Sequence, residues 1–490
     1  MGRDHSNPHD RSDGVDTVRA TAADLATYEE ARRQLSQMQV PLLHRADDAN
    51  SRLFVMGFDG TGNDMGQQAR QTWTNVALLH EQLEERRQDD RSIGTGYVAG
   101  PGTQEGFVAR TRDLITGRSF ESRVEEGYKQ FIDQASVWLK ENPNADIKVI
   151  ANGFSRGAEQ SAAFTRLVHE RGIQDPDGAV YERNGANEII GVRYTRPPLV
   201  APGQAAQVAL LYDPVATGQP EKHDRRLPPS ALTAFQITAR DEPRDQFPSS
   251  EHSSRGVSAD RRSLNAEAAG VHSNIGGSYT RNGLSDLNFN LAADYLNSVA
   301  DRPFVQKRAL SRDPADFVIH RSDQHQRIYT TRGMEDGERD RVQRLAPDAA
   351  CRPRGPCDDR EPVDERLAAR FEWRSPVVTV DPSQPVPEPT DSRPFWQRGE
   401  SPPAPTAPRT PVDDLFDRLS ISAATRDATA MRDASRNYVE TDGGQQWLQQ
   451  GRERNAAQAA ERAAEQARQA EGQRVPVLEV AEPSAPVMRR

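Results

Sequence analysis

The stretch VIANGFSRGAEQSAAF, residues 149–164, decides the fold of this chain of 490 residues. It begins as an apolar run typical of a buried strand, passes through Gly153-Phe154-Ser155-Arg156-Gly157, and continues as an alanine-rich stretch that favours helix. A strand, a G-x-S-x-G pentapeptide and a helix in this order predict a nucleophile elbow, whose serine occupies a strained backbone conformation. In such an elbow Gly153 and Gly157 keep side chains from colliding with strand and helix. The alternative is an ordinary serine N-cap, whose hydroxyl accepts a hydrogen bond from a helix amide.

Predicted strands and helices alternate on both sides of this segment. We expect strands at 52–58, 146–152, 207–213 and 232–238, and helices at 21–39, 120–142, 158–172 and 284–300. This alternation predicts an α/β fold, with a mostly parallel sheet that is covered by helices on both faces.

Composition divides the chain into five predicted regions. A polar N-terminal segment with one helix spans 1–50, and a catalytic domain spans 51–300. Residues 301–379 are expected to be a C-terminal extension of that domain or a lid. A proline-rich linker follows at 380–412, and a Gln- and Ala-rich tail at 413–490 is a candidate export or interaction segment.

Charge and hydropathy exclude several classes of protein. The net charge of −10 argues against a nucleic-acid-binding protein. No apolar run approaches the roughly 20 residues that a membrane-spanning helix needs, and no apolar signal segment follows Met1. We therefore expect a protein that is cytoplasmic in the producing cell and reaches other compartments only through specialised export. Cys351 and Cys357 are two loop thiols or a local disulfide, with no metal site expected.

A serine nucleophile needs a base, and His272 is the best candidate. It lies in AAGVHSNIGGSY, after a small apolar segment and before a Gly-Gly turn that permits close backbone approach. His169 falls on the helix after the elbow and would point away. The remaining later histidines lie in polar stretches typical of exposed side chains: His223, His252, His320 and His325.

The orienting acid is predicted to be Asp213, which ends the strand VALLYD and precedes Pro214. Open α/β sheets place their sites at such carboxyl ends of strands. Asp241, after the next strand, is the second choice, although its charged neighbours resemble those of a surface aspartate. Asp286 opens a predicted helix and is expected to be a cap.

An oxyanion requires preorganised N–H donors. One is expected from the amide of Arg156, and the other from the loop FDGTGND, residues 58–64, through Gly60 or Thr61. A phosphate-binding P-loop is excluded because no G-K-[ST] follows. An aspartate nucleophile of the haloacid dehalogenase type would need an aspartate at position 57, which is glycine. A purely structural turn remains an alternative for this loop.

Five motifs together resemble a known family. FDGTGN, GFSRGA, LYDPVATG, ARDEPRDQFP and GVHSNIGGSY occur in the order found in the bacterial type VI secretion lipase effectors of family one. The resemblance covers about residues 50–300 and implies an α/β-hydrolase-like fold, with Ser155 as nucleophile, Asp213 as acid and His272 as base. It implies a phospholipase that needs no cofactor. It also implies that this enzyme is delivered into competing bacteria. Its partners would be membrane phospholipid, a secretion apparatus and an immunity protein.

The chain departs from this family in two places. Asn274 stands where the family has aspartate, and the usual aromatic residues before GVH are replaced by AEAA. Neither change removes a member of the predicted triad. The tail after the proline-rich linker is similar in composition alone to C-terminal export signals of xanthomonad type IV secretion effectors.

The function expected from these features is a serine-dependent phospholipase. A carboxylesterase or thioesterase acting on a soluble substrate is the first alternative. A non-catalytic interaction protein on a hydrolase scaffold is the second.

Overall fold

The computed structural model describes five stretches of the chain. They are residues 13–101, 119–216, 222–324, 338–347 and 361–379, together with the isolated residues 436, 445 and 449. The chain separates into two units, 1–406 and 407–490, and the elements below belong to the first.

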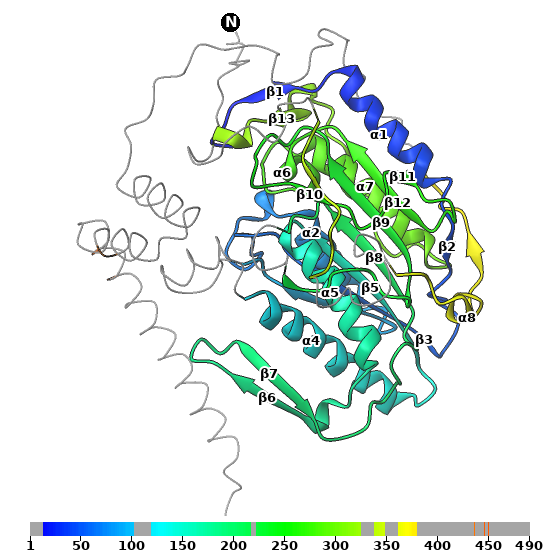
Figure 1. The fold of residues 1–490 in the computed structure, drawn as a ribbon. Coiled ribbons are helices and arrows are strands. Elements are labelled where there is room, and N and C mark those ends of the chain that lie inside the picture. Colours follow the sequence, from blue (N-terminus) through cyan, green and yellow to red (C-terminus); the bar gives the residue numbers. More distant parts are fainter. Residues whose placement is uncertain are drawn as a thin grey trace, which may run out of the picture. The chain divides into compact units, whose positions relative to one another are not determined.

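A seven-stranded sheet with the order β11-β12-β9-β8-β5-β3-β4 forms the centre of the first unit (Figure 1). Neighbouring strands run parallel, except that β11 is antiparallel to β12. The strands are β3 (Ser51–Phe58), β4 (Ile93–Val98), β5 (Asp146–Phe154), β8 (Gln207–Tyr212), β9 (Ala231–Ala239), β11 (Gly256–Val257) and β12 (Ser263–Ala268). The predicted α/β fold with a mostly parallel sheet is confirmed.

Helices cover both faces of this sheet, as Figure 1 shows. The core on one side contains side chains of α4 (Phe120–Glu141) and α5 (Arg156–Arg171). The core on the other side contains side chains of α1 (Ala22–Leu35), α2 (Asn75–Arg86) and α7 (Gly283–Ser298). A sheet buried on both faces explains why its central strands β3, β5 and β8 contain long apolar runs.

Strand β3 shows how the sequence serves both cores. Leu53 and Val55 pack with the helices α1, α2 and α7, whereas Phe54 and Met56 pack with α4 and α5. Successive side chains of a strand point to opposite faces, so a run of apolar residues supplies both.

The N-terminal segment docks on the sheet. Tyr28 and Leu35 of α1 are fully buried, and Thr21 and Asp24 form a capping box at its start. Strand β1 (Thr17–Arg19) pairs with β13 (Val318–His320). A helix is therefore present where one was expected over 21–39, although it ends at Leu35, and its apolar side chains contribute to the core.

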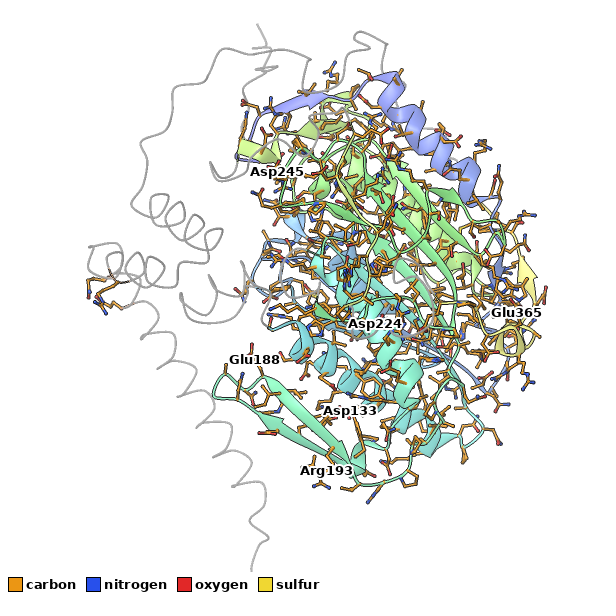
Figure 2. All side chains as sticks on the ribbon, in the orientation of Figure 1. Asp133, Glu188, Arg193, Asp224, Asp245 and Glu365 are labelled. Atoms are coloured by element: carbon orange, nitrogen blue, oxygen red, sulfur yellow. The ribbon has the colours of Figure 1, made fainter. Side chains whose placement is uncertain are left out.

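Smaller elements decorate the sheet. The strands β6 (Ala179–Arg183) and β7 (Ile189–Tyr194) form a hairpin, on which Figure 2 labels Glu188 and Arg193. Strand β10 (Ser249–Ser250) pairs with β14 (Arg341–Val342), and β2 (Val40–Pro41) pairs with β15 (Trp373–Arg374). The short helices are α6 (His272–Gly276), α8 (Glu365–Ala368) and the 3₁₀ turns Arg70–Thr72, Pro176–Gly178, Pro314–Asp316 and Ser322–Gln324.

Several expectations concern parts of the chain that the structure does not describe. Cys351, Cys357, His325 and the linker 380–412 lie outside the described residues, as does the tail 413–490 apart from three positions. In the described stretches, no helix has both the length and the apolar character required to cross a membrane.

Candidate active site

Ser155 sits on a sharp turn between β5 and α5. Its backbone angles, φ 60° and ψ −129°, lie in a region that a residue with a side chain rarely adopts. Ser155 occupies the position before α5, but its hydroxyl makes no capping hydrogen bond. The backbone is therefore that of an elbow, and the capping contact of the alternative interpretation is not formed.

Two glycines make this turn possible. A Cβ on Gly153 would lie 2.4 Å from both the Gly157 carbonyl oxygen and Ser161 Oγ. A Cβ on Gly157 would lie 2.2 Å from the carbonyl oxygen of Phe58. Neither position can therefore carry a Cβ without displacing its neighbours, and Gly157 also brings the elbow against the loop that follows β3.

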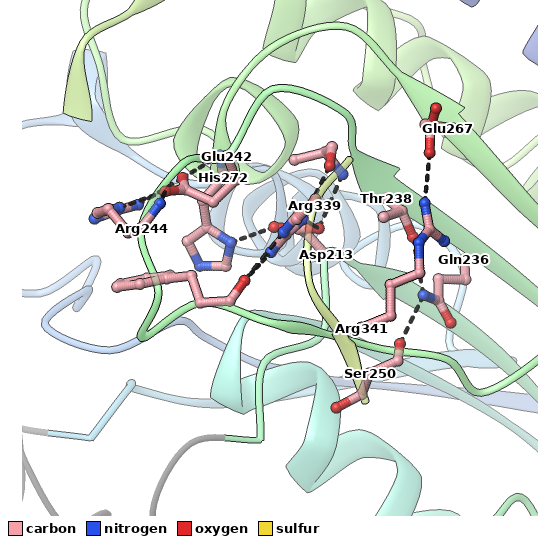
Figure 3. A network of polar contacts seen from close by, with 12 residues as sticks. Asp213, Gln236, Thr238, Glu242, Arg244, Ser250, Glu267, His272, Arg339 and Arg341 are labelled. Carbon is pink, nitrogen blue, oxygen red and sulfur yellow. Dashed lines mark hydrogen bonds and ion pairs between the residues drawn. The ribbon is translucent and has the colours of Figure 1, made fainter. Parts of the chain in front are cut away.

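His272 and Asp213 meet at the carboxyl ends of the strands (Figure 3). Asp213 follows β8 and is fully buried, and His272 begins α6 and is 4% exposed. The His272 Nδ1 and Asp213 Oδ2 atoms are 2.5 Å apart. An ionised Asp213 accepts a hydrogen bond from Nδ1–H, which leaves the lone pair of Nε2 available as a base.

Phe154, the residue before Ser155, contacts the imidazole of His272. The ring centroids of Phe154 and His272 are 4.5 Å apart, so the residue before Ser155 packs on the imidazole. Phe247 approaches the imidazole edge-on, with a centroid distance of 5.0 Å. Within the described residues Ser155 Oγ and His272 make no direct hydrogen bond, and catalytic contacts of this kind often shorten only when substrate is bound.

A residue that sequence reasoning missed binds the other oxygen of Asp213. Arg339 Nη1 lies 2.5 Å from Asp213 Oδ1, which also accepts a hydrogen bond from the Ala239 amide at 2.9 Å. Burial alone would raise the pKa of Asp213, but the Arg339 guanidinium and the contact with His272 outweigh it and lower the pKa to about 2. Arg339 stands 126 residues after Asp213 in an arginine-rich polar stretch, where no pattern distinguishes it.

A second ion pair borders His272. Its backbone amide donates to Glu242 Oε2 at 3.1 Å, and Arg244 Nε binds Glu242 Oε1 at 2.6 Å. The pKa of His272 is lowered chiefly by burial, against the opposing effect of Asp213. His272 is therefore neutral, and able to accept a proton, at neutral pH.

The alternative acid lies elsewhere. Asp241 pairs with Arg240 at 2.8 Å and accepts a hydrogen bond from the Gly270 amide at 2.7 Å, so Asp213 and not Asp241 contacts His272. The exposed setting expected for Asp241 is wrong, because its charge is buried beside Arg240. The capping role expected for Asp286 is also wrong: Asn282 precedes α7, and Asp286 pairs with Arg308.

The FDGTGND loop holds a buried carboxylate. Asp59 accepts hydrogen bonds from Tyr97 Oη at 2.6 Å, Thr74 Oγ1 at 2.8 Å and the Gly60 amide at 2.7 Å. The Gly60 amide is thus engaged within the loop. The Thr61 amide makes no hydrogen bond to any described residue.

Two histidines expected at the surface are buried. His252 Nε2 lies 3.2 Å from Glu159 Oε2, and His320 Nε2 lies 3.0 Å from Asp13 Oδ2. Asn274 explains the second case, because its Nδ2 lies 2.9 Å from His320 Nδ1 and its Oδ1 accepts from the His320 amide. Asn274, which stands where the family has aspartate, is thus part of a buried hydrogen-bond network.

No metal site is evident in the described residues, where no group of three or more His, Cys, Asp and Glu side chains is arranged to hold an ion.

His169, as expected, faces away from the elbow and contacts Ser230 Oγ at 2.9 Å.

The chain is similar to known proteins in two comparisons, one with protein families and one with solved structures. A family model described as the type VI secretion (T6SS) phospholipase effector Tle1-like catalytic domain matches these residues. Solved structures are similar to this chain at low identity. An uncharacterized protein from Pseudomonas aeruginosa is 15% identical (61% of this chain and 52% of that one, TM-score 0.34). The Tle1 effector bound to the VgrG spike of the type 6 secretion system is 20% identical (47% and 52%, TM-score 0.30).

A third structure, Thermogutta terrifontis esterase 2, is 14% identical, with 54% of this chain and 90% of that one covered and a TM-score of 0.26. The chain spans about half the length of the first two structures. No curated protein sequence matches it. The family model thus confirms, over residues 52–184, the resemblance to the type VI secretion phospholipase effectors that was inferred from the motifs.

Proposed function

We propose that the chain is a serine-dependent phospholipase, which hydrolyses acyl esters of membrane phospholipids. The observation that carries the proposal is Ser155 at φ 60°, on an elbow that packs against the His272–Asp213 pair. The family match supplies the substrate class, because it covers the elbow and the FDGTGND loop. Asp213 and His272 lie beyond the matched residues, so their roles rest on geometry.

The proposed reaction proceeds through an acyl-enzyme. His272 Nε2 takes the hydroxyl proton of Ser155 as its oxygen attacks the ester carbonyl, and Asp213 stabilises the imidazolium through Nδ1. His272 then protonates the leaving alcohol. Water, deprotonated by the same imidazole, releases the fatty acid from Ser155.

The oxyanion is proposed to bind two backbone amides. Arg156 directly follows the nucleophile and begins α5, where the helix dipole favours negative charge. Thr61 is a better second donor than Gly60, because the Gly60 amide already donates to Asp59. Asp59 would hold the loop so that the neighbouring amide faces the site.

Delivery into a target cell is proposed from the same family. A type VI secretion apparatus would export the protein, its target would be the membrane of a competing bacterium, and a cognate immunity protein would protect the producer. Residues 51–300 would be the catalytic domain and 301–379 its extension. The linker 380–412 and the tail 413–490 would serve export or interaction.

The test compares Ser155→Ala with a control at a serine of the helix that follows, Ser161→Ala. Fatty-acid release from phospholipid vesicles should fall by about 10³-fold or more in Ser155→Ala and remain near wild type in Ser161→Ala. A fluorophosphonate probe should label wild type and not Ser155→Ala.

Equal release by wild type and Ser155→Ala would overturn the mechanism. Labelled protein that cleaves short soluble esters but not vesicles would point to a carboxylesterase or thioesterase. Absence of labelling and of hydrolysis would favour an interaction protein on this fold.

A further inference from the structure

A short segment that belongs to none of the sequence motifs contacts the site. Residues 338–347, here called the strap, contribute β14, which runs parallel to β10. The Ser249 amide donates to the Asp340 carbonyl oxygen at 3.0 Å, and the Glu251 amide donates to that of Val342 at 3.0 Å. Leu345 is fully buried. These contacts fix the strap on the body of the unit.

Arg339 is the strap residue that reaches the site. Besides Asp213, its Nη1 donates to the Ala239 carbonyl oxygen at 3.0 Å. Its Nε and Nη2 donate to the Phe247 carbonyl oxygen at 3.0 and 2.7 Å. The side chain is 2% exposed. Figure 3 shows it beside Asp213. A guanidinium held by oxygen atoms on three segments has one available orientation, and that orientation presents a charged hydrogen bond to Asp213.

We propose that Arg339 is a positioning residue for the triad of Asp213, His272 and Ser155, an inference that rests on the proposed function. It holds the carboxylate so that Oδ2 faces His272 while Oδ1 is bound by Arg339 and the Ala239 amide. It also offsets the negative charge of Asp213, so that His272 stays neutral and basic over a wider pH range.

The charges around His272 fix the sign of this effect. Asp213 and Glu242 favour the imidazolium and raise the pKa of His272, whereas Arg244 opposes it. Arg339 acts on both carboxylates and lowers the pKa values of Asp213 and Glu242. Without Arg339, two carboxylates would be balanced by Arg244 alone. The imidazolium would then be more stable, and the pKa of His272 would rise.

The experiment compares Arg339→Met, Arg339→Lys and a control on the same strap, Arg341→Met. Arg341 binds Glu251 and Glu267, each at 2.7 Å, and makes no contact with Asp213. Two quantities are measured in the full-length chain. They are the pH profile of kcat/KM on a short soluble ester, and the pKa of His272 by NMR of labelled histidine, assigned with His272→Gln.

In Arg339→Met we expect kcat/KM at its optimum to fall by about 10²-fold, because the acid loses its fixed orientation. The pKa of His272, and with it the acid limb of the profile, should rise by about one unit. Arg339→Lys keeps the charge and loses most of the hydrogen bonds, so its rate should fall while the pKa of His272 stays near wild type. Arg341→Met should change neither quantity.

An unchanged pKa of His272 in Arg339→Met, with a rate loss no larger than in Arg341→Met, would overturn the proposal. If Arg339→Met does not fold, wild-type activity in Arg339→Lys, where the fork of hydrogen bonds is lost, would overturn it instead. The NMR titration needs no turnover. It therefore tests the effect of Arg339 on His272 even if Ser155 proves not to be a nucleophile.

Discussion

At the scale of single residues, two buried carboxylates near the elbow carry opposite pKa shifts. The Arg339 guanidinium and His272 lower the pKa of Asp213 to about 2 in spite of its burial. Burial raises the pKa of Asp59 to about 6, and its hydrogen bonds from Tyr97 and Thr74 only partly compensate. A cation stabilises a buried carboxylate more than neutral donors do, which suits an acid that must stay ionised.

The raised pKa of Asp59 predicts a dependence of stability on pH. Between its ordinary pKa of 3.8 and about 6, the folded protein binds more protons at this group than the unfolded chain. The contribution of Asp59 to the free energy of unfolding should therefore fall by about 3 kcal/mol as pH rises through this range. Asp59→Asn should lack this fall, and thus gain stability relative to wild type, in urea unfolding at pH 4, 5, 6 and 7. Parallel curves for the two proteins would contradict the assignment.

At the scale of elements, β5, the elbow and α5 form one continuous unit. Strand β5 lies between β8, which leads to Asp213, and β3, which leads to the FDGTGND loop. The parallel register places Phe154 beside Tyr212 and Gly153 beside Phe58. Because parallel strands end at one edge of the sheet, nucleophile, acid and oxyanion loop are brought to the same place.

Gly157→Ala tests how closely the elbow packs on that loop. The new Cβ would lie 2.2 Å from the Phe58 carbonyl oxygen and 2.4 Å from that of Asp59, so backbone must move. We expect a loss of about 1–3 kcal/mol in the free energy of unfolding, together with a loss of esterase activity. Gly185→Ala is the control, because nothing lies within 4 Å of its Cβ position. Wild-type stability and activity in both variants would contradict this close packing of the elbow on the loop.

At the scale of the whole first unit, segments far apart in the chain meet in a buried charged cluster. Glu159 of α5 binds Arg225 at 2.6 Å and His252 at 3.2 Å, and all three are almost fully buried. Burial would raise the pKa of Glu159, but Arg225 and then His252 outweigh it and lower the pKa to about 2. The Arg225 amide also donates to the carbonyl oxygen of Leu345, which links the cluster to the strap.

Breaking this cluster should be costly. Arg225→Met leaves the carboxylate of Glu159 buried with His252 as its remaining partner, and we expect the free energy of unfolding to fall by about 3–5 kcal/mol. The double variant Arg225→Met/Glu159→Gln should recover part of that loss, because the buried charge is removed with its partner. Urea denaturation of the three proteins measures both effects. A double variant no more stable than Arg225→Met would show that packing, and not the unpaired charge, determines the loss.

The sequence by itself determined the α/β order and the elbow. The apolar run of β5, the helix-forming stretch of α5 and the glycines at 153 and 157 act over a few residues, so local sterics already dictate the turn at Ser155. Strand β4 was not foreseen, because Gly94 and Gly96 interrupt its strand-forming residues.

Only the tertiary structure decided which distant groups complete the site. Asp213 and Asp241 both follow strands, and the fold pairs the first with His272 and the second with Arg240. The fold likewise engages the Gly60 amide, leaves that of Thr61 for the proposed site, and brings in Arg339. Such contacts depend on which loops lie next to one another in the assembled fold. A local pattern of residue types does not predict them.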